Sequence, residues 1–205
     1  MKRIVLLNGP KDSGKDFLGR KAAESFEGST AQFKEALYSH TADLFKVDYD
    51  WLVEVANDRV LKELPNDLLH GYSPRQALIY TSESVYKPIF GNDYFGKQTV
   101  EYINEFCGDI VFITDSGFRE EAEVVVSEYG AENCLLVNLY REGRKFDSTD
   151  SRGYINLDDL GVKRVEYHND CHYCNFLYMV ADWLPQFKAG WIPAFLQFKV
   201  KTGGE

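Results

Sequence analysis

The sequence predicts an α/β fold in which helices flank a parallel sheet, and three observations support this. Short apolar runs rich in Val, Ile and Leu recur along the chain, and longer amphipathic segments follow them. Such alternation of strand-like and helix-like segments is typical of parallel sheets. Hydrophobic residues make up 44% and charged residues 27% of the chain, as in a globular protein with one sizeable core. We therefore expect residues 1–205 to form a single domain.

Three apolar runs are predicted strands and cover residues 2–8, 109–114 and 134–140, and the more polar segment 163–168 is a candidate fourth strand. The predicted helices cover residues 15–26, 74–87, 94–106, 118–129 and 175–184. Residues 31–70 are charged and mostly helical in pattern, so we expect residues 31–106 to form a helical region. Because parallel strands end at the same edge of a sheet, the loops that follow the four strands should gather there.

The segment GPKDSGKD, residues 9–16, follows the first strand and opens the first helix. It fits the phosphate-binding pattern G-x-x-x-x-G-K-[ST] at seven of its eight residues. The glycines allow backbone N–H groups to point inward at the helix N-terminus, and the lysine would reach the β and γ phosphates of ATP. The alternative is a Gly-Pro turn with a solvated lysine. The predicted ATP-binding residues of this loop are Gly9, Lys11, Asp12, Ser13, Gly14, Lys15 and Asp16.

Asp16 stands where the pattern has a Ser or Thr hydroxyl that holds magnesium. A carboxylate can hold this hard cation directly or through water, although an acidic residue is also common in the first turn of a helix. Asp115 ends the second predicted strand near the same edge, where it would orient magnesium and its waters. The sequence therefore predicts a magnesium site at Asp16 and Asp115.

Two arginines, Arg75 and Arg119, stand at the start of predicted helices, where the helix dipole disfavours a positive charge. Holding a phosphate through the guanidinium donors would explain both positions. The alternatives are pairing of Arg119 with acidic neighbours on its own helix and an ordinary solvated helix around Arg75. Gln76 and Ser82 lie on the same segment as Arg75 and are candidates for hydrogen bonds to a base or sugar.

Residues 141–155 are polar and charged and form a predicted lid. Flexible basic loops can close over a transferring phosphate, exclude water and neutralise charge. The alternative is a solvated charged loop. The basic residues of this segment are Arg141, Arg144, Lys145 and Arg152.

Charge and hydropathy exclude several classes of protein. The formal net charge of −9 at pH 7 and the lack of a basic stripe argue against nucleic-acid binding. No apolar run reaches the ~20 residues that a membrane helix needs, and the apolar N-terminal run is too short for a signal peptide, so we expect a cytoplasmic protein. Cys171 and Cys174 form a C-x-x-C without a second such pair, so reduced thiols are expected rather than zinc.

The order of the motifs also resembles a known family. The segments that carry the likeness are residues 9–16, 74–78, 82–83, 92–97, 115–123, 139–141 and 169–170. Together they resemble the deoxynucleoside monophosphate kinases of tailed bacteriophages, which belong to the P-loop nucleoside monophosphate kinases. Members of that family open with G-x-x-x-x-G-K-D, which makes Asp16 a family feature. The resemblance implies a P-loop NTPase three-layer sandwich with a helical monophosphate-binding insertion over about residues 31–106 and a short lid over about 141–155.

This resemblance implies transfer of the γ-phosphate of ATP, with magnesium, to a deoxynucleoside monophosphate, in the host cytoplasm if a phage encodes the chain. The glycine loop, Asn169 and Arg141 would bind ATP. Acceptor-binding residues would be Arg75, Gln76, Ser82, Tyr86 and Arg119. Catalytic residues would be Lys15, Arg119, Arg141, Arg144 and Arg152.

Two other functions fit the same residues. One is another small-molecule P-loop kinase that acts on a nucleoside or a coenzyme precursor, and the other is a nucleotide-binding regulator without turnover. A homodimer is expected from the resemblance and from apolar C-terminal residues, which could instead pack on the sheet. These residues are Trp191, Ile192, Phe195 and Leu196.

Overall fold

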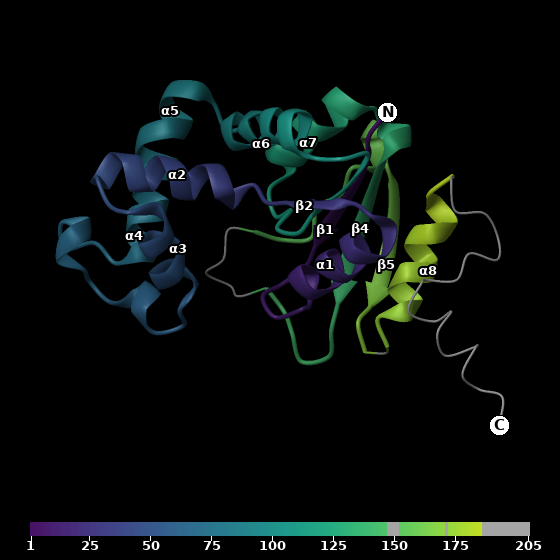
Figure 1. Cartoon of the computed structure of the whole chain (residues 1–205), viewed down its shortest axis with the longest axis horizontal. Helices are drawn as coiled ribbons and strands as arrows, with labels where there is room; N and C mark the ends of the chain where they lie inside the picture. The colour runs from purple at the N-terminus through teal and green to yellow at the C-terminus, as the bar shows by residue number, and fades with distance from the viewer. Residues whose placement is uncertain (147–151, 171, 186–205) are drawn as a thin grey trace.

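A computed structural model describes residues 1–146, 152–170 and 172–185, so Cys171 and the C-terminal residues proposed for a dimer lie outside the described residues. The described chain forms a five-stranded sheet of order β2-β3-β1-β4-β5, in which all neighbouring strands run parallel (Figure 1). The strands are β1 (Arg3–Asn8), β2 (Ser29–Ala31), β3 (Ile110–Ile113), β4 (Cys134–Tyr140) and β5 (Lys163–His168). The predicted parallel α/β fold is confirmed.

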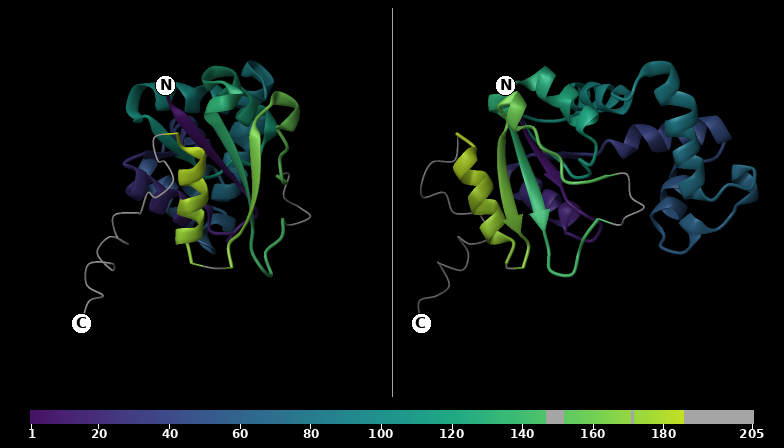
Figure 2. Two further views of the ribbon diagram at one scale, coloured as in Figure 1. Left: turned by 90° about the vertical axis from the view of Figure 1, so that its right-hand side faces the viewer. Right: turned by 180° about the vertical axis from the view of Figure 1, so that it is seen from behind.

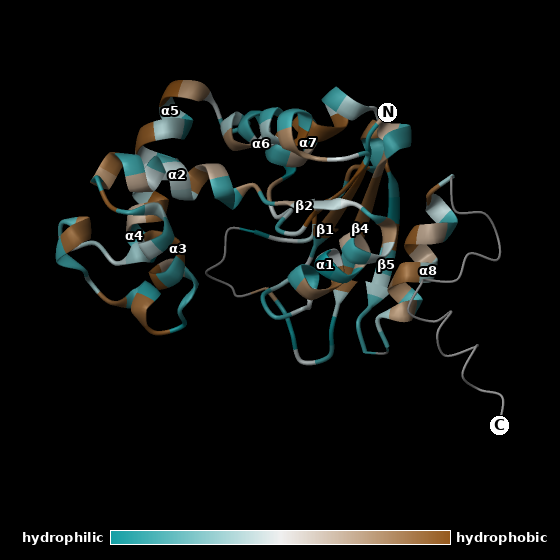
Figure 3. Cartoon of the chain, viewed as in Figure 1, coloured by the Kyte–Doolittle hydropathy of each residue, from teal (hydrophilic) through white to brown (hydrophobic). Residues whose placement is uncertain are grey.

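Four of these strands lie within one residue of their predicted bounds, and β2 is the strand that the sequence prediction missed. It is only three residues long and pairs with β3 alone, so it leaves no periodic pattern in the sequence. The three interior strands β1, β3 and β4 are almost fully buried. The edge strand β5 is mostly exposed, and Figure 3 shows its hydrophilic colour beside the hydrophobic interior strands.

Helices cover both faces of the sheet and make three layers. On one face α1 (Lys15–Phe26) and α8 (Cys174–Trp183) pack on alternate residues of β1, β3 and β4. On the other face α6 (Tyr94–Phe106) and α7 (Arg119–Tyr129) pack on the intervening residues. This alternation is the period of two that a strand imposes on its side chains. The chain therefore has the predicted three-layer arrangement.

A helical insertion between β2 and β3 extends away from the sheet, as the right panel of Figure 2 shows. It contains α2 (Lys34–Phe45), α3 (Tyr49–Asn57), α4 (Pro74–Ile79), a π-helix (Tyr80–Tyr86) and α5 (Lys87–Phe90), with two 3-10 turns at Leu61–Glu63 and Asp67–Leu69. Its own small core includes Phe45, Leu52 and Leu69. The helix predicted over 74–87 thus changes its hydrogen-bonding register twice before it ends. It also runs past the predicted end at residue 87, because Pro88 lies in the first turn of α5, where its missing backbone N–H costs no helical hydrogen bond, and the segment ends at Phe90.

None of the helices in the described residues is long and apolar enough to cross a bilayer. Cys107, Cys134 and Cys174 are free thiols, and the described part of the chain holds no cluster of side chains that could bind a metal through three or more His, Cys, Asp or Glu groups.

Asn8, the buried last residue of β1, forms hydrogen bonds to two loops, which are the loop after β3 and the end of the predicted lid. Its side-chain amide donates to the carbonyl oxygens of Ser116, at 2.6 Å, and Gly153, at 3.0 Å. Its side-chain oxygen accepts from the backbone N–H of Ile155 at 3.0 Å. One amide group therefore holds the loop after β3 and the end of the lid against the glycine loop.

We predict that Asn8→Ala lowers the free energy of unfolding by about 3 kcal/mol, because it leaves buried backbone groups without partners. Urea unfolding followed by circular dichroism measures the change. Asn104→Ala is the matched control, because Asn104 is exposed and bonds only to surface groups on α7. Equal, small losses in the two variants would contradict the role assigned to Asn8.

Candidate active site

The glycine loop leads from β1 into α1 and adopts backbone angles that its glycines permit. Gly14 precedes α1 with a φ of 98° in the left-handed region, and a Cβ atom there would lie 2.3 Å from Nδ2 of Asn169. At Gly9 a Cβ atom would lie 2.7 Å from the carbonyl oxygen of Leu139. A larger residue would be strained at Gly14 and would collide with the backbone at Gly9, so the loop depends on glycine at both positions. The resulting turn points the first N–H groups of α1 to the edge of the sheet.

Lys15 folds back over this loop. Its ammonium donates to the carbonyl oxygens of Gly9, at 2.6 Å, and Pro10, at 2.8 Å. The ammonium therefore stands above the loop, where a lysine can contact a bound polyphosphate.

The loops after β4 and β5 meet the glycine loop, as the sequence predicts for parallel strands. Asn169 donates from its side chain to the carbonyl oxygen of Ser13 at 2.8 Å. Arg141 donates to the carbonyl oxygen of Asp12 at 3.0 Å, and the Arg144 guanidinium lies 3.5 Å from the Asp12 carboxylate. The structure thus brings Asn169 and Arg141 of the predicted ATP site, and Arg144 of the predicted catalytic set, together around the loop.

The two predicted magnesium ligands lie on adjacent segments at the edge of the sheet. One oxygen of Asp16 accepts from the Thr114 hydroxyl at 2.8 Å and from the Gln32 amide at 3.0 Å. Both oxygens of Asp115 accept backbone N–H groups at the start of α2, at 2.9 and 3.0 Å. Burial raises the pKa of Asp115, and these backbone bonds lower it in part. The second oxygen of Asp16 takes no part in these bonds, so hard oxygen donors suited to magnesium stand beside the glycine loop.

A cavity of about 590 Å³ lies between this edge and the helical insertion, a size suited to a small-molecule ligand. Eight basic residues and four acidic residues are among the described residues that line it. The basic ones are Lys11, Lys15, Lys34, Arg59, Lys62, Arg75, Lys87 and Arg152, and the acidic ones are Asp12, Asp16, Asp115 and Glu121. The cavity therefore concentrates positive charge in a protein whose formal net charge is −9.

Three of these basic groups form a cluster in which Lys11 of the glycine loop lies near Lys62 and Arg75 of the insertion. Lys62 of the insertion is largely buried, and its pKa is lowered first by that burial and then by the nearby Lys11 and Arg75. Glu63 offsets part of this repulsion and lies 3.0 Å from the Arg75 guanidinium. Cations held this close favour an anionic ligand between them.

Two predicted acceptor-binding residues lie outside the cavity lining, while Ser82 lies within it. The Gln76 side chain accepts from the backbone N–H of Ser73 at 2.9 Å and completes a capping box at the start of α4. Tyr86 stacks on His40 at 4.5 Å between ring centroids. Local helix capping and aromatic packing therefore engage these two side chains.

Arg119 also lies outside this cavity. Its guanidinium pairs with Glu123 and Asp159, each at 2.6 Å, and donates to the carbonyl oxygen of Asn156 at 2.6 Å. The pairing with an acidic neighbour on its own helix, which the sequence left open as an alternative, is the arrangement present. Arg152 does line the cavity, and the stem of its side chain packs on Gly117.

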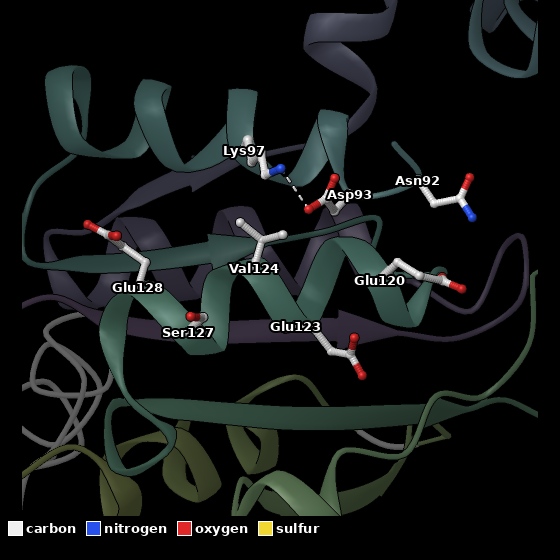
Figure 4. A pocket seen from close by; sticks show the side chains of 8 residues that line it. All are labelled: Asn92, Asp93, Lys97, Glu120, Glu123, Val124, Ser127 and Glu128. Atoms are coloured by element: carbon white, nitrogen blue, oxygen red, sulfur yellow. Dashed lines mark ion pairs between the residues drawn. The ribbon is translucent and has the colours of Figure 1, made fainter. Parts of the chain in front are cut away.

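A second groove, of about 490 Å³, lies between α6 and α7 (Figure 4). Lys97 is the one basic residue among the residues drawn there, and its ammonium pairs with Asp93 at 2.8 Å. Three glutamates, Glu120, Glu123 and Glu128, complete its charged lining. This excess of negative charge makes the groove unsuitable for phosphate.

Several cavity residues escaped the sequence prediction. Lys34, Lys62 and Lys87 come from the insertion, where no motif marked them, and tertiary structure alone brings them to the cavity. Glu121 follows the Asp115 segment on α7 and is only 6% exposed. Burial, and secondarily the charge of Asp115, raises the pKa of Glu121 to about 8.

The sequence comparisons found no matching family model and no matching curated protein. Among solved structures, a sugar kinase from Janibacter sp. HTCC2649 is similar with a TM-score of 0.44 and 10% identity, and the match covers 89% of this chain and 94% of that one. Shikimate kinase from Aquifex aeolicus has a TM-score of 0.44 and 12% identity, with 86% of this chain and 93% of that chain covered. Shikimate kinase from Bacteroides thetaiotaomicron has a TM-score of 0.34 and 12% identity, with 90% and 78% covered.

These proteins share too little sequence and structure with the chain to indicate its function. The fold is established by the chain itself. Its central strand leads through a glycine-rich loop into a helix, and helices cover both faces of a parallel sheet of order 2-3-1-4-5. The chain therefore has a P-loop NTPase fold.

We predict that Glu121→Gln stabilises the chain relative to the wild type in a pH-dependent way. Below about pH 4.5 the folded and unfolded wild-type chains both hold the Glu121 proton. Between about 4.5 and 8 only the folded chain keeps it, so wild-type stability falls as pH rises through this window, by at most about 1.4 kcal/mol per pH unit. Glutamine does not ionise, so the advantage of the variant should grow across the window and level off above pH 8.

Urea unfolding at pH 5, 7 and 8.5, in the presence of a metal chelator, measures this advantage. A difference between Glu121→Gln and the wild type that does not change with pH would contradict the assigned burial of Glu121.

Proposed function

We propose that this chain transfers the γ-phosphate of ATP to a deoxynucleoside monophosphate. The observation that carries the proposal is that one cavity is lined by basic groups on two sides. Lys15 and Lys11 of the glycine loop stand on one side, and Lys62 and Arg75 of the insertion stand on the other, with Lys62 close to Lys11. A donor and an acceptor that both carry phosphate would occupy these two places together.

On the donor side, the N-terminus of α1 and the backbone N–H groups of the glycine loop bind the phosphates of ATP. Asp16 and Asp115 would hold magnesium, directly or through water, and this cation would neutralise charge on the transferring phosphoryl group. Asn169 fixes the loop by its bond to the Ser13 carbonyl group.

On the acceptor side, the basic cluster supports a substrate that already carries a phosphate. Lys62 is close to Lys11 and Arg75, and their repulsion adds to burial in lowering the pKa of Lys62. A monophosphate placed between these groups would replace repulsion by charge-assisted hydrogen bonds. The preference for a deoxy sugar is supported by the motif order in the sequence.

Two arginines, one from the insertion and one from the predicted lid, converge on Asp12 of the glycine loop. Arg59 from the insertion and Arg144 from the lid each lie 3.5 Å from its carboxylate. Contacts from both sides would close the cavity over the substrates and exclude water. Arg152 and Arg141 remain the candidates for stabilising charge in the transition state.

A second candidate is a P-loop kinase whose acceptor is an alcohol. The observation that favours it is the buried carboxyl group of Glu121 in the cavity, because a hydroxyl acceptor needs a base within reach. The basic cluster favours the monophosphate kinase over this candidate.

We predict that the purified chain releases ADP from magnesium-ATP in the presence of at least one of dAMP, dGMP, dCMP and dTMP. Lys15→Ala should slow turnover by roughly 100-fold or more, because it removes a cation from the phosphates. Lys62→Ala should raise the KM for the acceptor about tenfold and leave the KM for ATP nearly unchanged. Ribose counterparts of the four acceptors test the sugar preference.

Lys21→Ala serves as the control, because Lys21 pairs with Glu24 on the surface of α1. An absence of turnover with every monophosphate, in a chain that binds ATP, would refute the monophosphate kinase assignment.

A further inference from the structure

We propose that Glu121 determines specificity for the acceptor by hydrogen-bonding its nucleobase in a subsite formed with Ser82, Lys87 and Phe118. This inference rests on the proposed function, and it assigns the uncharged part of the acceptor to a place in the cavity. All four residues line the same cavity as the glycine loop.

The first observation is that Glu121 is buried and has no partner. Its side chain is only 6% exposed, yet it lines the cavity. Within residues 1–146, 152–170 and 172–185 its carboxyl group makes no hydrogen bond and no ion pair. Buried carboxyl groups are normally paired, so one that faces a cavity without a partner indicates a ligand that supplies the missing bonds.

The second observation is that the nearby cation is already engaged. The Lys87 ammonium pairs with Glu83 at 2.6 Å and lies 4.8 Å from the centre of the Phe118 ring. Ser82 donates to the same Glu83 oxygen at 2.9 Å. Glu83 therefore accepts from both neighbouring donors, the Ser82 hydroxyl and the Lys87 ammonium, and the Glu121 carboxyl group stays available to a ligand.

The charged groups that act on Glu121 come from four segments of the chain. Asp115 at the end of β3, Glu120 on α7 and Glu83 on the π-helix raise its pKa, and Lys87 at the start of α5 lowers it. Burial is the largest influence and also raises it. In either protonation state the carboxyl group can accept from a ring N–H or an exocyclic amino group, and the protonated form donates as well.

This chemistry matches the polar edge of a nucleobase, which presents donors and acceptors side by side. The ring of Phe118, which is half-buried, supplies an apolar wall against which a planar heterocycle can pack. The basic cluster lies on the insertion and on the glycine loop, whereas Glu121 lies on α7, which follows Asp115 in the chain. The phosphate and the base of the acceptor would thus be bound by residues on different sides of the cavity.

The experiment compares Glu121→Ala, Glu121→Gln and the control Glu120→Ala in steady-state kinetics with each active acceptor. Glu120 is exposed and is the preceding residue of α7. We expect Glu121→Ala to raise the acceptor KM at least tenfold, and the KM for ATP to change less than twofold. Glu121→Gln, which can still donate and accept, should stay within about threefold of the wild type, and Glu120→Ala should match the wild type.

An unchanged acceptor KM in Glu121→Ala would overturn the inference. A Glu121→Gln variant that turns over at least about 100-fold more slowly at unchanged KM would also overturn it, because that result would make Glu121 a general base. Circular dichroism and the thermal midpoint of each variant check that it is folded, and Glu121→Gln keeps the test valid if the alanine variant does not fold.

Thermal shifts with each monophosphate in the absence of ATP separate this inference from the proposed function. A monophosphate that stabilises the wild type but not Glu121→Ala, in a chain without turnover, would support the subsite and refute the kinase. Equal stabilisation of both would refute the subsite alone, and stabilisation of neither by any monophosphate would refute both.

Discussion

The carboxylate of Asp115 is the constraint on which the site depends. Its two oxygens accept the backbone N–H groups of Phe33 and Lys34, and so fix the first turn of α2 to the carboxyl end of β3. The whole helical insertion begins at that turn, and the cations it contributes to the cavity are positioned from there. On the preceding residue of the same strand end, Thr114 bonds to Asp16 of the glycine loop. One edge of the sheet thus sets the geometry of the glycine loop, of the proposed metal ligands and of the proposed acceptor side.

The charge of the cavity lining is opposite in sign to the net charge of the chain. The chain carries a formal net charge of −9, yet its cavity gathers basic side chains from the glycine loop, the insertion and the lid. Low-dielectric walls strengthen such a local electric field, which raises the concentration of anionic ligands at the site. The rest of the surface remains acidic on average and so does not attract nucleic acid. The groove between α6 and α7, by contrast, is lined by an excess of negatively charged side chains (Figure 4).

Sequence reasoning succeeds here where the signal is local. The runs of β1, β3 and β4 are buried on both faces, and the glycine loop has a fixed spacing, so both could be predicted. The gathering of Asp115, Arg141 and Asn169 near that loop followed from the parallel sheet alone. Sequence reasoning failed for β2, which is too short to show a periodic pattern of apolar residues. Sequence reasoning also could not foresee that helix capping engages Gln76, that Arg119 pairs with the distant Asp159 as well as with its own helix, or that tertiary packing brings Lys62 and Glu121 into the cavity.

The central claim is that the donor and acceptor phosphates lie in one cavity, close enough for direct transfer. The most direct measurement is the affinity, by calorimetry, of a bisubstrate compound in which ATP is joined through one further phosphate to a deoxynucleoside. The account predicts one molecule bound per chain and an affinity at least about tenfold above that of ATP, because one ligand would fill both phosphate sites. A bisubstrate compound that binds no more tightly than ATP, for every base tried, would contradict it.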